Sequence, residues 1–479
     1  MSWKHIVLFF GILGIYVICI QPDWSWAGYD CDAGDFWNTA LYAQLSHFPG
    51  NPLFSMISWL AVRIPLGTEG WRLAFFLSTI PAVLICVIVF YVVKKQTEHR
   101  WAPYIGCLSV AGANIFLMQS VVVETYVFSA LVAVSAYALI VHKRYTLAAI
   151  ATGLMTGVHP FTLFVLIAII VWSKEVRRRW RLWIPAAVLP YIWVITLGLT
   201  RPSFSVFTST GGGMFQYGVG SLQENAQYWG SLALSDIPQK VVMIVVVFVG
   251  AFGLCLIPMA YAVNRKYAVV VAAAAVPVVY YMGNMMDLTV HHLALAVPFL
   301  GILAGLGMDR VRSLPAGLIV APSLIFLVLL PFHYDLGNNL DENLSGAQFY
   351  RSLDDIEDGS IIMTLNIYKD GMFFSGRENT FVLIYNKNTG RSLIPVTQSY
   401  FSDQSLLGYE SVGQKYRQDL LDKYGIDTPW TYDEDKERQE NMWDNMVILK
   451  AANPDHHVYY IRIPEENTLN RILEEYYDR

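Results

Sequence analysis

The chain has 479 residues, of which 55% are hydrophobic and 15% charged, and its mean hydropathy is +0.40. That composition excludes a soluble globular protein, because runs of about 20 apolar residues, the length that crosses a bilayer, recur through the first two-thirds. The net charge of −5 is unevenly divided: residues from Asp341 onward carry 25 acidic and 14 basic side chains, and the rest is net positive. A hydrophobic bundle with an acidic soluble tail is therefore predicted, with no nucleic-acid partner.

The cysteines and the N-terminus add two further exclusions. Four of the five cysteines lie in apolar runs and only Cys31 lies in a polar loop, so neither a disulfide framework nor a cysteine-based zinc site is expected. The apolar run Met1 to Ile20 lacks a small-residue cleavage site before Gln21-Pro22. It is therefore predicted to be an uncleaved first membrane span.

Apolar runs separated by basic residues predict a polytopic helical protein with about 11 transmembrane helices. They lie near residues 4–20, 71–93, 103–118, 125–141, 145–157, 160–173, 183–200, 240–261, 267–283, 292–308 and 314–332. The runs 145–157 and 160–173 are short for a full crossing, so a broken or partly re-entrant pair is expected there. The apolar stretch Pro52 to Pro65 is too short to span and predicts an interfacial helix.

Basic clusters orient the predicted spans. If the spans alternate, all these clusters fall on one side, which the positive-inside rule makes cytoplasmic. The clusters are Lys94-Lys95, Lys143-Arg144, Lys174 with Arg177-Arg178-Arg179, Arg265-Lys266, and Arg310 with Arg312. The opposite face receives the loop after the first span, the long loop 201–239 and the C-terminal region. A multi-pass protein of the plasma membrane with an extracytoplasmic C-terminal domain is the resulting expectation.

The chain is expected to divide into a transmembrane module, residues 1–333, and a small α/β domain, residues 334–479. Two segments of the second part, 360–364 and 458–463, are typical of buried strands, and two others, 414–423 and 466–477, of amphipathic helices. This part contains no phosphate loop, nucleophile elbow or metal-ligand spacing. It is expected to act as a lid or an acceptor-recognition module.

Ionisable residues gather at the ends of the predicted spans on the outer face. Three carboxylates, Asp30, Asp32 and Asp35, follow the first span, and other candidates lie at later span ends: Arg72, Glu124, His159, Arg201, His291 and His292. Each alone is more often a helix anchor than a ligand. Together, carboxylates and cations on one face predict a site that handles a proton and a phosphate.

The loop motifs resemble a family related to the protein O-mannosyltransferases of the GT-C glycosyltransferase superfamily. Asp32-Ala33-Gly34-Asp35-Phe36 followed by His47-Phe48-Pro49-Gly50-Asn51-Pro52-Leu53-Phe54 is similar to the family's D-x-G-E-F and H-P-P-G-x-P-L-F first outer loop. Three shorter elements agree: Trp71-Arg72-Leu73, Glu124-Thr125-Tyr126, and Gly153-Leu154 to His159. The resemblance covers roughly residues 1–310. Asp35 stands where the family has glutamate, and Phe48 interrupts the second motif.

The resemblance implies a GT-C fold and a glycosyltransferase that uses a polyprenyl-phosphate sugar as donor. Asp32 or Asp35 would accept the proton of the acceptor hydroxyl, and Arg72, His159 and Arg201 would bind the lipid phosphate. Glu124, His47 and Asn51 would contact the sugar or the acceptor, which is a protein Ser/Thr, a lipid or a glycan. Asp30-Cys31-Asp32 has a D-x-D spacing that binds divalent cations in other glycosyltransferases, but no cofactor is expected with certainty.

Two other function classes fit parts of the sequence. A transporter or flippase of lipid-linked sugars would place paired charges near mid-membrane and show two related halves, and neither is evident. A non-catalytic scaffold with an acidic tail would leave the aspartate loop unexplained. A glycosyltransferase is therefore the leading prediction, and transport is the alternative.

Overall fold

The structure is a computed structural model in which two compact units can be described. The described residues are 3–20, 36, 39–40, 51–200, 237–263, 267–283, 290–311, 315–333, 356, 360–365, 380–385, 392–396, 421–422, 425–427, 429, 438–462 and 472–475. One unit holds most described residues up to His333 and is helical, and the other holds the strands from Ile361 onward. The boundary expected at residues 333/334 stays a prediction.

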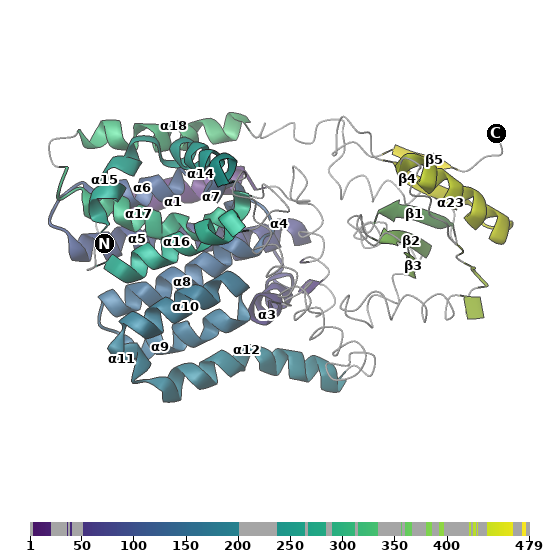
Figure 1. Ribbon diagram of the computed structural model, residues 1–479, viewed down its shortest axis with the longest axis horizontal. Helices are drawn as coiled ribbons and strands as arrows, with labels where there is room; N and C mark the ends of the chain where they lie inside the picture. The colour runs from purple at the N-terminus through teal and green to yellow at the C-terminus, as the bar shows by residue number, and fades with distance from the viewer. Residues whose placement is uncertain are drawn as a thin grey trace. The chain divides into compact units, whose positions relative to one another are not determined.

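The helical unit is formed by helices of very different lengths (Figure 1). They are α1 (Trp3–Ile18), α3 (Pro52–Ala61), α4 (Glu69–Ala74), the π-helix η1 (Phe75–Thr79), α5 (Ile80–Gln96), α6 (Ala102–Ala111), α7 (Asn114–Ser120), α8 (Thr125–Val141), α9 (Tyr145–Leu154), the 3₁₀-helix η2 (Met155–Gly157), α10 (Pro160–Trp172), α11 (Lys174–Arg177), α12 (Trp180–Thr200), α14 (Ile237–Phe252), the 3₁₀-helix η3 (Gly253–Cys255), α15 (Leu256–Ala262), α16 (Ala268–Gly283), the 3₁₀-helix η5 (Val290–Leu295), α17 (Val297–Gly307) and α18 (Ala316–His333). Every predicted apolar run coincides with one of these helices or with two or three consecutive ones.

Two helical stretches in the described part are long and apolar enough to cross a membrane, Glu69–Gln96 and Lys240–Ala262. A third joins α6 and α7 if that bent pair counts as one span. The remaining apolar helices are shorter, so the expected number of about 11 transmembrane helices stays a prediction.

Exposed apolar faces give independent support for a lipid environment. Along α14, valines 241, 242, 245, 246 and 249 are all exposed, a spacing that places them on one helix face. Similar faces occur on α10, α12 and α18. Water-soluble surfaces rarely carry contiguous apolar patches of this extent, whereas lipid-facing helices require them.

Small residues allow the helices of the core to approach closely. A Cβ atom on Gly106 of α6 would lie 2.9 Å from the carbonyl oxygen of Gly301 in α17, and one on Gly307 would lie 1.8 Å from that of Pro258 in α15. Between membrane helices there is no hydrophobic driving force, and contacts of this kind supply the packing instead. The α6–α17–α15 packing therefore depends on glycine at these positions.

The helical unit contains a bend that the sequence pattern does not predict. The bent pair is α6 and α7, whose axes differ by 62° around Gly112 and Ala113. A Cβ on Gly112 would lie 2.0 Å from the backbone oxygen of Ser323 in α18, so α18 packs directly against the bend. The predicted broken or re-entrant pair, α9 and α10, folds back on itself, since the guanidinium of Arg179 lies 5.3 Å from the ring centroid of Tyr145 at the start of α9. Its partial insertion in the membrane stays a prediction.

The second unit contains a five-stranded sheet with strand order β3-β2-β1-β4-β5. The strands are β1 (Ile361–Leu365), β2 (Thr380–Tyr385), β3 (Ser392–Val396), β4 (Val458–Arg462) and β5 (Ile472–Glu475). The central strand β1 is parallel to β2 and β4, and both edge strands are antiparallel. Helix α23 (Arg438–Ala452) packs on β4, burying Met446 and Leu449 against Ile361, Met363 and Val458.

The strand predictions at 360–364 and 458–463 are confirmed by β1 and β4, but the helix predicted at 466–477 is wrong at 472–475, the part of it that the structure describes. Residues 472–475 form β5 because their backbone pairs with β4, with Leu473 opposite Ile461. Tertiary pairing has overridden the local helical pattern. Most of the helix predicted at 414–423 lies outside the described residues.

Substituting Gly307 with alanine should destabilise the helical unit. The added Cβ meets the Pro258 carbonyl at 1.8 Å, and overpacking of this kind costs about 1–3 kcal/mol. The measurement is the melting temperature of the purified protein in detergent. Gly317→Ala in α18 is the matched control, because a Cβ there meets nothing within 4 Å. Equal melting temperatures for the two variants would contradict the close-packing argument.

Candidate functional site at the starts of three helices

Several residues predicted for the site lie outside the described residues. Asp30, Asp32, Asp35, His47 and Arg201 are in this group. His291 and His292 belong to η5, which packs against α7 and α8, but their side chains are not among the described ones. The described candidates are therefore Asn51, Arg72, Glu124 and His159.

Glu124 directly precedes α8 and is almost completely buried. Its Oε2 atom accepts a hydrogen bond of 3.3 Å from the Thr125 backbone N–H. A carboxylate is favourable here because the first turn of a helix has unpaired N–H groups and a partial positive charge. The start of α8 therefore fixes an acidic side chain inside the helical unit.

His159 has the same position at α10. Its Nδ1 atom accepts a hydrogen bond of 3.3 Å from the Phe161 backbone N–H, and Pro160 occupies the first helical position, where no N–H is needed. The Thr162 hydroxyl donates a hydrogen bond shared between the carbonyls of Met155 and His159, which links the first turn of α10 to the segment before it. Because Nδ1 acts as an acceptor, a neutral His159 ring carries its proton on Nε2.

The two helix starts lie together. The ring centroids of Tyr126, in the first turn of α8, and His159 are 5.2 Å apart. Since α9 returns the chain to this end, α8 and α10 begin side by side and run the same way. Two helix N-termini and an imidazole thus meet beside the Glu124 carboxylate, and the partial positive charge of the helix starts favours that carboxylate.

Helix α3 begins at the same place. Phe54 packs edge-on against Phe128 of α8 at 5.8 Å, and a Cβ on Gly157 would lie 3.2 Å from that of Leu53. Asn51, which precedes α3, is buried and has φ of 33°, a left-handed conformation that asparagine tolerates better than most residues. The structure therefore brings together Asn51, Glu124 and His159, which are far apart in sequence.

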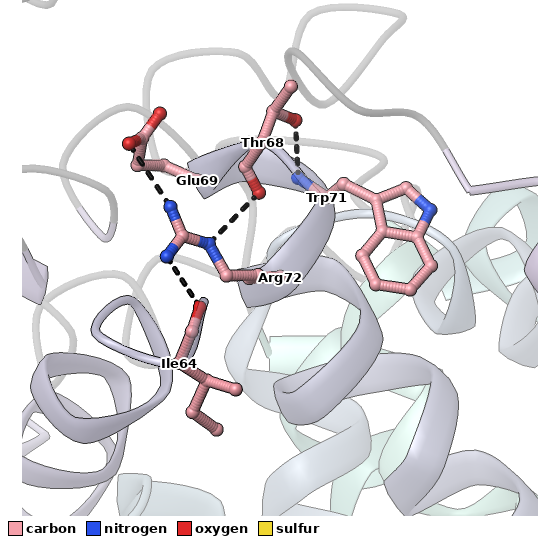
Figure 2. Close-up of polar contacts among 5 residues, drawn as sticks. All are labelled: Ile64, Thr68, Glu69, Trp71 and Arg72. Carbon is pink, nitrogen blue, oxygen red and sulfur yellow. Dashed lines mark hydrogen bonds and ion pairs between the residues drawn. The ribbon is translucent and has the colours of Figure 1, made fainter. Parts of the chain in front are cut away.

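Arg72 is used to fold the chain that leads into the second span (Figure 2). Its Nη1 donates to the carbonyl of Ile64 at 2.6 Å, its Nε to that of Thr68 at 3.3 Å, and its Nη2 pairs with Glu69 at 3.1 Å. Three of its five N–H groups are thus engaged. Two remain for a ligand, so the predicted phosphate contact stays a prediction.

The π-helix η1 contributes two hydroxyls that sequence reasoning missed. Thr79 donates a 2.8 Å hydrogen bond to the carbonyl of Ser120, and Ser78 donates a longer one, 3.5 Å, to that of Glu124. Single-turn π-helices inside longer helices are frequent at functional sites, since they re-aim side chains. Here η1 ties the second span to the irregular segment that carries Glu124. A Ser-Thr pair within an apolar run was the available signal.

The described basic clusters lie at the other end of the helical unit. Helix α8 is about 26 Å long at 1.5 Å per residue, so Lys143 and Arg144 are that far from Glu124 along its axis. Helix α11, which joins α10 to α12, lies at the left end in Figure 1, and α3 and α4 lie at the right. These basic clusters and the candidate site thus lie at opposite ends of the helical unit.

Among the residues that the structure describes, no group of three or more histidine, cysteine, aspartate and glutamate side chains could hold a metal ion. The Asp30-Cys31-Asp32 spacing falls outside them. Metal dependence stays untested.

The sequence matches no family model and no curated protein. Among solved structures, the chain is similar to the crystal structure of ArnT from Cupriavidus metallidurans bound to undecaprenyl phosphate, with 13% sequence identity and a TM-score of 0.49. The similarity covers 96% of this chain and 94% of that chain. A TM-score this low supports no statement about activity, and the resemblance to the O-mannosyltransferase-like family stays a prediction.

Replacing Thr79 with valine should destabilise the site. It leaves the Ser120 carbonyl without its buried donor, at a cost of about 1–3 kcal/mol. Thr152→Val is the matched control. The Thr152 hydroxyl donates a hydrogen bond to the Ala148 carbonyl one turn earlier in the same helix, and that carbonyl also accepts the backbone hydrogen bond of the helix. The melting temperature should fall further for Thr79→Val. A larger loss in Thr152→Val would refute the role of η1.

Proposed function

We propose that this protein is a membrane glycosyltransferase of the GT-C type that transfers a sugar from a polyprenyl-phosphate donor to an acceptor hydroxyl. The observation that carries the proposal is the meeting of the starts of α3, α8 and α10, with Glu124 and His159 as caps. A site of this kind offers the partial positive charge of the helix starts and the His159 ring for a phosphate, and a carboxylate for sugar or acceptor hydroxyls.

In the proposed reaction, the acceptor oxygen attacks the anomeric carbon while the bond from that carbon to the phosphate oxygen breaks. The bonding electrons leave with the phosphate, and Asp32 or Asp35 takes the hydroxyl proton. His159, the helix starts and Arg201 would stabilise the phosphate as its charge grows, and the two remaining N–H groups of Arg72 would add to this. Glu124, Asn51 and His47 would bind the sugar or the acceptor.

The proposal places the candidate site and residues 334–479 on the extracytoplasmic face of the plasma membrane. The basic end of the helical unit would then face the cytoplasm. The acceptor belongs to one of three classes, a protein Ser/Thr, a lipid or a glycan. The C-terminal unit would cover or select it.

Transport of lipid-linked sugars is the second candidate, and the 62° bend between α6 and α7 is the observation that favours it. Discontinuous helices form the substrate sites of many transporters. At the bend described here, however, Gly112 packs directly against Ser323 of α18. The capped helix starts lie at one end of the helical unit, which suits transfer at a membrane surface better.

The direct test uses purified protein in nanodiscs with a panel of radiolabelled polyprenyl-phosphate sugars and a crude acceptor extract. Label should move to water or to an acceptor, and the Asp32→Asn/Asp35→Asn double variant should abolish that transfer, because both proposed bases have lost the carboxylate that takes the proton. If a folded wild-type protein transfers no label from any donor, while liposomes containing it show flux of lipid-linked sugar, transport replaces transfer.

His159→Asn should separate the structural role of this residue from its chemical role. Asparagine is among the best N-cap residues, so the variant should keep a melting temperature close to wild type, whereas His159→Ala should lose about 1 kcal/mol. Both variants should lose turnover, by on the order of 100-fold, because the Nε2–H donor is gone. Full activity in a stable His159→Asn protein would exclude His159 from the site.

A further inference from the structure

Exposed apolar side chains lie in the last turn of α3 and in the segment that follows it, at the end of the helical unit that carries the candidate site. Leu60 is 50% exposed, Ile64 38% and Leu66 45%, and Pro65 between them is also exposed. Single exposed leucines are common on protein surfaces, but such a cluster within seven residues marks a contact with another apolar phase. We call residues Leu60–Gly67 the anchor loop.

The anchor loop has a fixed backbone. Arg72 donates to the carbonyl of Ile64, inside the loop, and to that of Thr68, directly after it (Figure 2). The loop ends at Gly67, which has φ of +62° and lies against the ring of Trp71, with 3.1 Å between its Cβ position and the nearest ring atom. A loop held in this way keeps Ile64 and Leu66 partly exposed.

The loop continues an apolar surface that is already expected to face lipid. Trp59, the residue before the loop, packs against Trp193 of α12 with ring centroids 5.5 Å apart. On α12, Leu189 and Ile192 are exposed beside this contact. The outward apolar face of α12 therefore extends into the anchor loop, and bilayer lipid would cover both.

Arg63 marks the level of the membrane interface. Its guanidinium lies 4.2 Å from the centroid of the Trp59 ring, and its Nη1 donates to the Trp59 carbonyl at 2.6 Å. Partial burial lowers the pKa of this guanidinium, but arginine remains charged at neutral pH. A tryptophan beside an arginine with an apolar stem is typical of the zone where acyl chains meet phosphate groups.

We propose that the anchor loop inserts Leu60, Ile64 and Leu66 among the phospholipid acyl chains of the leaflet nearest the candidate site, with Arg63 at the phosphate level. Arg72 acts as the positioning residue that keeps the loop in this shape. The insertion does not depend on the proposed function. Only its consequence does: the loop would hold the candidate site at the height of a lipid-linked phosphate.

The test is the depth of a nitroxide label at Leu66→Cys in phosphatidylcholine nanodiscs, in a Cys31→Ser background. Oxygen partitions into acyl chains, whereas a nickel chelate stays in water. The ratio of the label's accessibility to oxygen and to the nickel chelate therefore reports how deep the label lies in the bilayer. The ratio at position 66 should match that of a label at Val245→Cys, on the exposed face of α14, rather than one at His142→Cys, in the exposed turn after α8.

Arg72→Gln should release the loop and shift the ratio at position 66 toward that of the His142 label. Glu69→Gln is the matched control, since it removes the ion pair and leaves both carbonyl bonds of Arg72 in place. It should shift the ratio less. If Arg72→Gln does not fold, the label in the otherwise unchanged protein still decides whether the loop is inserted.

Two results would overturn the proposal. A label at position 66 that the nickel chelate reaches as easily as position 142 would place the loop in water. A label that neither reagent reaches would mean that protein, and not lipid, covers it. An unchanged depth in a folded Arg72→Gln variant would remove the positioning role of Arg72.

Discussion

The need to satisfy backbone N–H groups at helix starts is the constraint on which this structure depends. Each helix leaves four N–H groups without an intrahelical partner, and an apolar surrounding makes every unsatisfied one costly. In α8 and α10 the chain meets part of this need with Glu124 and His159. Polar side chains that cap helices are thereby fixed at one end of the unit. The same requirement that stabilises the fold thus assembles a site with both acidic and basic character.

Close helix packing keeps these caps together. Gly157 allows Pro190 of α12 and Leu53 of α3 to approach the backbone closely, because a Cβ atom at this position would lie 2.3 Å from Pro190 and 3.2 Å from Leu53. His159 follows two residues later, so its position is set by a contact that only glycine permits. The π-helix η1 also helps to hold the segment that carries Glu124, because the hydroxyls of Ser78 and Thr79 donate hydrogen bonds to carbonyls in that segment. Site geometry is therefore a property of the whole helical unit.

Some of this could be predicted from the sequence. Apolar runs fix where helices form, and alternation of their direction is enough to put Glu124 and His159 at the same end. Basic residues such as Lys143 fall at the other end for the same reason. The strands β1 and β4 were recognisable from continuous apolar runs with β-branched and aromatic residues.

The remainder depends on contacts that a linear pattern does not contain. Helix α18 packs against the bend at Gly112, and the linear apolar pattern does not contain that contact. The π-helix arises from hydroxyl bonds to a segment 41 to 46 residues away. Strand β5 forms only because β4 offers an edge. Arg72 was expected to bind phosphate, yet its bonds to Ile64 and Thr68 are visible only in three dimensions.

The central claim is that the capped end of the helical unit binds a lipid-linked phosphate. The most direct measurement is photo-crosslinking in nanodiscs with a polyprenyl-phosphate analogue that carries its reactive group beside the phosphate. The modified peptides are then identified by mass spectrometry, and competition with unlabelled polyprenyl phosphate controls for specificity. The account predicts competed labelling of peptides that contain Asn51, Glu124 or His159. Competed labelling confined to peptides around Lys94, Lys143 or Lys174 would contradict it.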